Sequence, residues 1–216
     1  MTPPLTERTF AAVLFDNDGT LTDSTAAVLR SWTTWAHEHD LPPEALLGFH
    51  GFPAASIIAR VLPDADQDVA LARIAELEEA DTDGVVALPG AEQALMDVRA
   101  RGAIVTSATR QLATVRLDAA GLQIPEIMVT VDDITHGKPD PEPYLLAAQR
   151  LGVAPADCLV VEDAPSGLTS AKAAGCATLA LLTTTHAEEL DADLVVADLS
   201  CVTFANVDGR VRVIAD

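Results

Sequence analysis

The spacing of apolar residues changes in a regular way along this chain. From residue 88 onward, short apolar runs that suit buried strands alternate with stretches whose apolar positions recur every three or four residues, as on one face of a helix. Such alternation predicts a parallel sheet with helices on both faces. The expected strands are 103–106, 127–131, 158–161, 177–181 and 194–196, the expected helices are 90–101, 111–119, 141–151 and 166–174, and a hairpin is expected around Asp208-Gly209.

One further strand is expected over residues 11–15, apart from that alternation. The apolar spacing over residues 23–87 is helical, as around both tryptophans, and predicts no strand. The simplest arrangement places the first strand in one sheet with the later strands. We therefore expect an α/β fold with a Rossmann-like, doubly wound core made of residues 1–22 and 88–216, and an all-α domain of residues 23–87 inserted into it.

Two acidic residues follow the first expected strand, at the end where open parallel sheets bind their ligands. If the strand geometry continues, Asp16 and Asp18 project to the same side and Asn17 to the other, because side chains alternate along a strand. Two carboxylates held close together imply a hard metal ion, a shared proton or both. The alternative is an ordinary turn rich in Asp, Asn and Gly.

The next two strands of the core are also followed by polar residues. Ser107, Ala108 and Thr109 open a helix whose backbone N–H groups could hold a phosphate, although Ser107 taken alone suits an ordinary helix N-cap. Lys138 lies between a glycine and a proline in a stiff loop, and in so acidic a chain it is the natural counter-charge for a phosphate. His136 beside it is expected to be a surface residue.

A second acidic pair, Glu162 and Asp163, follows the strand expected over 158–161. Because the carboxyl ends of parallel strands meet at one edge, Asp163 could complete a Mg²⁺ site with Asp16, and Glu162 could bind the ion directly or through water. Either acid could instead cap the helix that follows.

The composition and net charge of the chain limit the classes of molecule that it is expected to bind. The chain has 216 residues, 49% of them hydrophobic, which indicates a globular protein, and its 33 acidic and 13 basic residues give a formal net charge of −20. Such a surface repels nucleic acids and anionic membranes. The three widely spaced cysteines suit reduced thiols, and no targeting segment or membrane-spanning apolar run is recognised. We expect a cytoplasmic protein that acts on a small molecule, with no obligate protein partner indicated.

Four motifs stand in order at these strand ends: DNDGT, a serine after the second core strand, GKP and ED. Together they resemble the haloacid dehalogenase superfamily of aspartyl-phosphate hydrolases, and the helical insertion resembles the mobile cap of that superfamily. The segments TSATR, HGKPDPEPYL and VEDAPSGLTSAKAAGC are similar to the branch that contains sugar, deoxyglucose-phosphate and glycerol-phosphate phosphatases. RSWTTWAHEHDL and EADTDGVVALPGA are most similar to bacterial sugar phosphatases of that branch.

The resemblance implies a role for each residue. Asp16 attacks phosphorus and becomes an aspartyl phosphate, and Asp18 protonates the leaving oxygen and then activates the hydrolytic water. Ser107 and the Ala108 N–H hold the phosphoryl group, with Thr106 in place of Ser107 if the register shifts by one residue.

The resemblance also implies a metal site and a substrate contact. Asp16, Asp163 and the nearby Glu162, with the backbone carbonyl of Asp18, would hold Mg²⁺, while Lys138 neutralises the phosphoryl oxygens. His50 is a candidate substrate-binding residue, because its cap segment would close over the leaving group.

The predicted activity is Mg²⁺-dependent hydrolysis of small phosphomonoesters, with sugar or polyol phosphates as substrates. One alternative is a phosphomutase of the β-phosphoglucomutase type, but that resemblance predicts a cap histidine near Val28 and a cap arginine near Ala54, and neither is present. Another is a phosphoglycolate-type phosphatase, although Phe52 stands where relatives often carry a basic residue. A dehalogenase would not need Asp18, and a silent binding protein would not need all four motifs.

Overall fold

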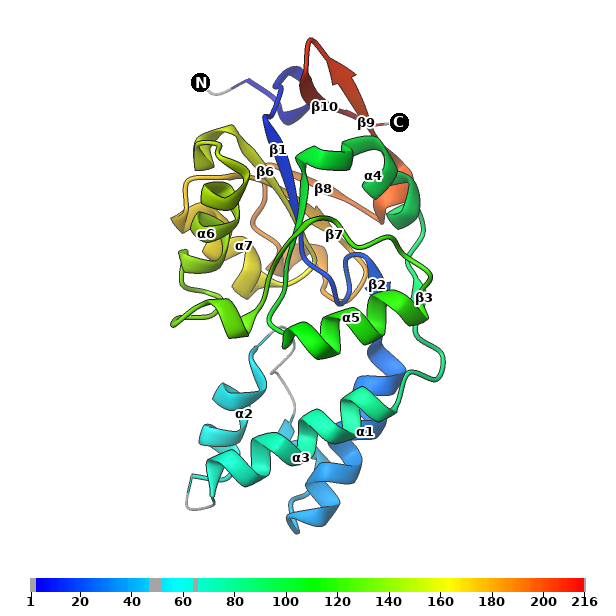
Figure 1. Ribbon diagram of the computed structural model, residues 1–216, viewed down its shortest axis with the longest axis vertical. Coiled ribbons are helices and arrows are strands. Elements are labelled where there is room, and N and C mark those ends of the chain that lie inside the picture. The colour runs from blue at the N-terminus through cyan, green and yellow to red at the C-terminus, as the bar shows by residue number, and fades with distance from the viewer. Residues whose placement is uncertain (1–2, 47–51, 64–65, 216) are drawn as a thin grey trace.

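The computed structural model describes residues 3–46, 52–63 and 66–215. Its core is a six-stranded parallel sheet with the strand order β5-β4-β1-β6-β7-β8 (Figure 1). The first strand of the chain therefore lies inside the sheet, between β4 and β6. The strands are β1 (Ala12–Phe15), β4 (Gly102–Val105), β5 (Ile127–Val129), β6 (Cys158–Glu162), β7 (Ala177–Leu181) and β8 (Leu194–Val196).

Helices cover both faces of the sheet. Two of them, α4 and α5, share a buried cluster with Phe15 on one face, and α6 and α7 share a second cluster with Leu14 on the other. Successive residues of β1 face opposite clusters because side chains alternate along a strand, and burial on both faces explains its unbroken apolar sequence. These helices are α4 (Ala91–Val98), α5 (Arg110–Ala119), α6 (Glu142–Leu151) and α7 (Pro165–Ala173).

Three further helices form a group at the end of the sheet to which β1 points (Figure 1). They are α1 (Thr25–Glu38), α2 (Ala54–Val61) and α3 (Gln67–Ala80), and they enclose a buried cluster of their own that includes Trp35. The chain enters this group through β2 (Thr22–Asp23) and leaves it through β3 (Val86–Ala87), which pair antiparallel. Both connections to the core therefore lie side by side, and the division of the chain into two domains stays a prediction.

Short elements complete the described chain. β9 (Val202–Val207) and β10 (Arg210–Ala215) form the expected antiparallel hairpin, and both Asp208 and Gly209 in its turn have positive φ. No helix within residues 3–46, 52–63 and 66–215 is long and apolar enough to cross a membrane, and the three cysteines are free. The 3-10 helices are Leu5–Glu7, Pro43–Leu46, Arg99–Arg101, Val131–Asp133, Pro155–Asp157, Ala187–Glu189 and Leu199–Cys201.

The expected fold class is confirmed, and each strand and helix expected after residue 88 is present. The strands over 177–181 and 194–196 have the expected ends, and the ends of the other elements are shifted. The strand expected over 127–131 stops at Val129, because a 3-10 helix begins at Val131. The expectation of no strand over residues 23–87 is wrong, since β2 and β3 occupy its two borders. Strands of two residues are too short to show a periodic pattern.

Candidate active site

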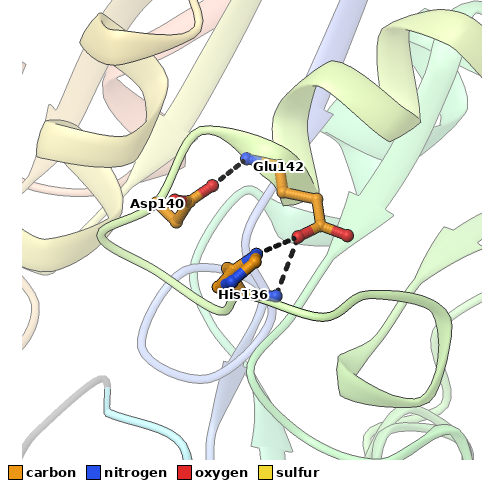
Figure 2. A group of neighbouring side chains, drawn as sticks. All are labelled: His136, Asp140 and Glu142. Carbon is orange, nitrogen blue, oxygen red and sulfur yellow. Dashed lines mark hydrogen bonds and ion pairs between the residues drawn. The ribbon is translucent and has the colours of Figure 1, made fainter.

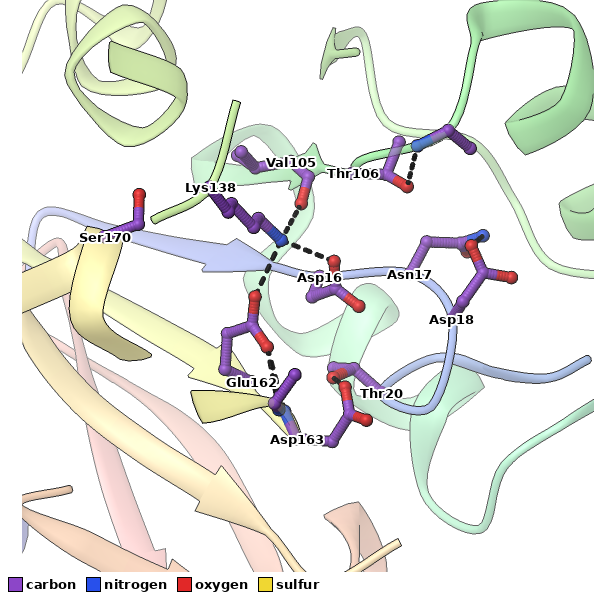
Figure 3. Close-up of polar contacts among 12 residues, drawn as sticks. Asp16, Asn17, Asp18, Thr20, Val105, Thr106, Lys138, Glu162, Asp163 and Ser170 are labelled. Atoms are coloured by element: carbon purple, nitrogen blue, oxygen red, sulfur yellow. Dashed lines mark hydrogen bonds and ion pairs between the residues drawn. The ribbon is translucent and has the colours of Figure 1, made fainter. Parts of the chain in front are cut away.

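The candidate site lies where the carboxyl ends of β1, β4 and β6 meet (Figure 3). Asp16 directly follows β1, Val105 ends β4 and Glu162 ends β6. The three strands are neighbours in one parallel sheet, so their ends deliver side chains from distant parts of the sequence to one place.

Lys138 stands at the centre of this site. Its ammonium group donates hydrogen bonds to Asp16 Oδ1 at 2.6 Å, Glu162 Oε1 at 2.7 Å and the Val105 carbonyl oxygen at 2.9 Å. An ammonium has three donors, and all three are used. The side chain is only 3% exposed, so Lys138 is a buried cation held by two carboxylates.

The loop that carries Lys138 is braced from its outer side by Glu142 (Figure 2). The Glu142 carboxylate accepts hydrogen bonds from the backbone N–H groups of Thr135 at 2.9 Å and His136 at 2.8 Å, and it lies 3.0 Å from His136 Nδ1. Asp140 in turn accepts a bond from the Glu142 N–H at 2.9 Å. His136 is exposed, as expected, and its contacts with Glu142 help to hold this loop in place.

Burial and the neighbouring charges act in opposite directions on the pKa values of Asp16 and Lys138. Burial raises the pKa of Asp16 well above its ordinary value, against Lys138, which lowers it, while Glu162 and Asp163 add to the rise. Burial alone lowers the pKa of Lys138, but Asp16 and Glu162 outweigh that effect and the pKa lies above its ordinary value. One ammonium thus faces several carboxylates, which favours binding of a further cation.

Both oxygens of Glu162 are occupied. Besides the ammonium, Oε1 accepts a bond from the Tyr144 hydroxyl at 2.8 Å, and Oε2 accepts bonds from the N–H groups of Asp163 and Ala164, each at 3.1 Å. Gly167 leaves room for this carboxylate, since a Cβ at that position would lie 1.7 Å from Oε1. Glu162 is therefore fully enclosed by donors of the protein.

Asp163 lies next to the turn that follows β1. Thr20 donates to its Oδ1 at 3.0 Å, and the Thr184 hydroxyl donates to its Oδ2. Gly19 has a φ of +88°, and a Cβ there would lie 2.3 Å from Asp163 Oδ2, so this turn requires glycine. Two hydroxyls and a close backbone fix the carboxylate beside Asp16.

The three acids expected to hold a metal are brought together. Asp16, Glu162 and Asp163 each offer a carboxylate oxygen, and these atoms all lie within 4.8 Å of one another. All three residues are buried. A cluster of carboxylate oxygens with a surplus of negative charge fits a hard divalent cation such as Mg²⁺.

Asp18 lines a cavity that Asp16 also lines, although the assigned strand β1 ends at Phe15. The Asn17 amide lies beside Asp18 and donates to its Oδ2 at 3.2 Å. Asp18 Oδ1 accepts bonds from Ser24 Oγ at 2.7 Å and from an Arg116 nitrogen at 3.0 Å. Its carboxylate is thus stabilised by protein donors outside the acidic cluster.

The segment after β4 shows whether Ser107 is the N-cap of the helix that follows. The N-cap of α5 is Thr109, which accepts a bond from the Leu112 N–H at 3.2 Å, so Ser107 is not the helix cap. The Thr106 hydroxyl accepts a bond from the Ala108 N–H at 3.1 Å. Thr106 is buried, whereas Ser107 is partly exposed.

A cavity of about 540 Å³ extends from Asp16 and Asp18 into the helical group. Among its described lining residues, the basic side chains are Lys138 and Arg116, and both are paired with carboxylates. His50 lies outside the described residues. The lining on the side of the helical group is mostly apolar and includes Val28, Leu29, Trp32, Ala54, Ile57 and Ile74.

Two charged residues of this cavity were missed by sequence reasoning. Arg116 on α5 donates to Asp18 and also to Glu78 Oε1 on α3 at 3.0 Å. Burial raises the pKa of Glu78 against Arg116, which lowers it. The available indication was periodicity: Arg116 shares a buried stripe with Leu112, and Glu78 lies four residues after the buried Ile74.

Comparison with known proteins identifies the family to which this chain belongs. A model of the haloacid dehalogenase-like hydrolase family matches residues 13–181, and the chain belongs to this family. The resemblance drawn from the four motifs is confirmed, including its branch.

The particular relatives are phosphatases. Hexitol phosphatase A from Escherichia coli K12 is 42% identical over 198 residues, covering 88% of this chain and 92% of the relative. Validoxylamine A 7'-phosphate phosphatase from Streptomyces hygroscopicus subsp. limoneus is 33% identical, covering 92% and 98%. A crystal structure of a hydrolase from Pseudomonas syringae has a TM-score of 0.79 at 28% identity, covering 88% of this chain and 94% of that one.

Proposed function

We propose that this protein is a Mg²⁺-dependent cytoplasmic phosphatase that hydrolyses small sugar or polyol phosphates through an aspartyl-phosphate intermediate. The observation that carries the proposal is the position of Asp16, which accepts a hydrogen bond from a buried ammonium and shares a cluster of carboxylate oxygens with Glu162 and Asp163. The names of the relatives, which include a hexitol phosphatase, support the class of substrate.

In this proposal Asp16 attacks the phosphorus atom. Lys138 holds the Asp16 carboxylate in place and offers positive charge to the phosphoryl oxygens. Asp16 and Asp163 would hold Mg²⁺, which supplies Lewis-acid stabilisation of the phosphoryl charge. We assign Glu162 to fixing Lys138, because four donors of the protein, two on each oxygen, already surround its carboxylate.

Asp18 serves as the general acid and base. It lines the cavity beyond Asp16, so it can give a proton to the leaving oxygen and then take one from the water that hydrolyses the aspartyl phosphate. Ser107, at the start of the segment leading into α5, would bind the phosphoryl group. The Ala108 N–H would join it by exchanging its present acceptor, the Thr106 hydroxyl, for a phosphoryl oxygen.

The helical group of α1, α2 and α3 acts as a cap in this proposal. The paired strands β2 and β3 are its two adjacent connections to the core, which suits a hinge, and the cavity lies between the group and the core. Crystals with and without a phosphate mimic that showed the same orientation of the group would contradict cap movement.

The cavity favours an uncharged leaving group. Among its described basic side chains, Lys138 would serve the phosphoryl group that is transferred and Arg116 is paired with Asp18, so neither is available to a second phosphate. Val28 and Ala54, which stand near the positions where the mutase resemblance expects a histidine and an arginine, both line the cavity. Water is therefore a better phosphoryl acceptor here than a second sugar phosphate.

The test is phosphate release from a panel of hexitol, glycerol, sugar, glycolate and nucleotide monophosphates with Mg²⁺. We expect release from polyol or sugar phosphates, and a loss of at least about 10³-fold in Asp16→Asn, because an amide is no nucleophile. Release that persisted in Asp16→Asn would refute the mechanism. Interconversion of sugar 1- and 6-phosphates without release would establish a mutase instead.

A further inference from the structure

A buried chain of charges joins the proposed general acid to the cap. Arg116 uses its two terminal nitrogens for different partners: one donates to Asp18 Oδ1 and the other to Glu78 Oε1, each at 3.0 Å. Asp18 belongs to the turn after β1, Arg116 to α5 of the core and Glu78 to α3 of the helical group. The chain therefore crosses the cavity from core to cap.

Both ends of the contact between Arg116 and Glu78 are buried, so this ion pair has a larger energetic effect than a surface pair. The side chains of Arg116 and Glu78 are 5% and 8% exposed, whereas surface ion pairs have ample solvent around both partners. Removing one partner of a buried ion pair is unfavourable because the remaining charge is less well compensated. Without Glu78, Arg116 would keep Asp18 as a carboxylate partner but would lose the contact that ties it to α3.

The contact with Asp18 sets the direction of its carboxylate. Ser24, at the start of α1, donates to the same oxygen that accepts from Arg116. Asp18 is thereby held by donors from the core and from the first residue before the cap helices. A general acid must lie within hydrogen-bond reach of the oxygen it protonates, so its orientation decides its efficiency.

We propose that Arg116 is a positioning residue that aligns Asp18 with the leaving oxygen, and that Glu78 holds Arg116 in that alignment only while the cap lies against the core. This proposal rests on the proposed function, because it assumes that Asp18 is the general acid. It adds a link by which the position of α3 governs protonation of the leaving group.

The test compares two substrates that differ in their need for a proton. Expulsion of an alkyl alcohol from glycerol or hexitol phosphate requires a general acid, whereas the phenolate of p-nitrophenyl phosphate leaves without one. The value of kcat/KM reports steps up to formation of the aspartyl phosphate. We expect Arg116→Gln to lower kcat/KM for the alkyl phosphates about 10- to 100-fold and for p-nitrophenyl phosphate less than about 3-fold.

Glu78→Gln should give a smaller loss of the same selective kind, and it should add little in the Arg116→Gln background, because both changes act through one chain. Arg116→Lys, which keeps the charge but not the two-pronged geometry, should fall between the wild type and Arg116→Gln. Arg73→Gln, at an exposed ion pair on the same helix as Glu78, is the matched control. It should leave kcat/KM unchanged for the alkyl phosphates and for p-nitrophenyl phosphate.

Equal losses on both substrates, or no loss on either, would overturn the proposal. If Arg116→Gln does not fold, as shown by lost activity on p-nitrophenyl phosphate and a lost thermal transition, Glu78→Gln and Arg116→Lys decide the matter. A wild-type protein that releases phosphate from none of the substrates would contradict the proposed function itself, so the two failures are distinguishable.

Discussion

Lys138 and Asp16 are 122 positions apart in the sequence and are joined by a 2.6 Å hydrogen bond from Nζ to Oδ1. This pair, extended by Glu162, joins the loop before α6 to the ends of β1 and β6. The same contacts support the site electrostatically and hold the carboxyl edge of the sheet together.

Lys138→Gln should therefore damage stability and activity together. The change leaves Asp16 and Glu162 buried without their shared cation, and we expect unfolding to become easier by about 3 kcal/mol at pH 7 without Mg²⁺. Phosphate release should fall at least about 100-fold. Denaturant titration and steady-state kinetics measure the two effects.

Lys172→Gln is the matched control for that change. Lys172 also pairs with a carboxylate, Asp191, at 2.6 Å, but the Asp191 side chain is 94% exposed. We expect a change in unfolding free energy within about 0.5 kcal/mol. Similar losses in both variants would show that burial of Lys138 has no special weight.

Metal binding should stabilise the folded protein through Asp163. Mg²⁺ added to protein treated with a chelator should raise the Tm of the wild type, because a ligand that binds only the folded state stabilises it. Asp163→Asn removes one carboxylate from the cluster with Asp16 and Glu162 and should reduce that rise by more than half. An undiminished rise in Asp163→Asn would place the ion elsewhere.

We expect the hydroxyl of Ser107 to bind the phosphate and the hydroxyl of Thr106 to stabilise the fold. Ser107→Ala should raise KM roughly tenfold with little change in Tm, since a hydrogen bond to a charged group is lost. Thr106→Val removes the acceptor for the Ala108 N–H and should lower unfolding free energy by about 1 kcal/mol. Were Thr106→Val to raise KM as much as Ser107→Ala, Thr106 would be a phosphate-binding residue.

Asp133 should make the protein sensitive to acid. Hydrogen bonding from Arg150 is the main cause that lowers the pKa of Asp133 from 3.8 to about 2, with bonds from Thr130 adding to it. The folded state thus binds this proton less tightly than the unfolded state, so the stabilisation is present above pH 3.8 and is lost as pH falls toward 2.

Asp133→Asn should accordingly lower the unfolding free energy by about 1–2 kcal/mol at pH 7, and the difference from wild type should shrink between pH 5 and pH 2. Thermal unfolding at a series of pH values measures it. Asp191→Asn, at an exposed pair, serves as the control and should show no such trend. A difference that stays constant with pH would exclude ionisation of Asp133 as its cause.

Local patterns of residues predicted the fold class and the acids and lysine that the structure brings together at the sheet edge. Apolar runs and helical spacing are local patterns, so they predicted the strands and helices after residue 88 within a few positions. Three acids stand at strand ends, at positions 16, 162 and 163, and Lys138 lies in a loop between a glycine and a proline. Parallel strands place their carboxyl ends at one edge, and this rule predicted that the three acids would lie together.

Packing between distant elements supplies the remaining contacts of the candidate site. Asp18 accepts a hydrogen bond from Arg116, which comes from α5 and belongs to none of the four motifs. Glu78 reaches the site only because α3 packs toward α5 across the cavity. Such contacts depend on packing between elements far apart in the chain, and no local pattern of residues encodes which buried charges will meet.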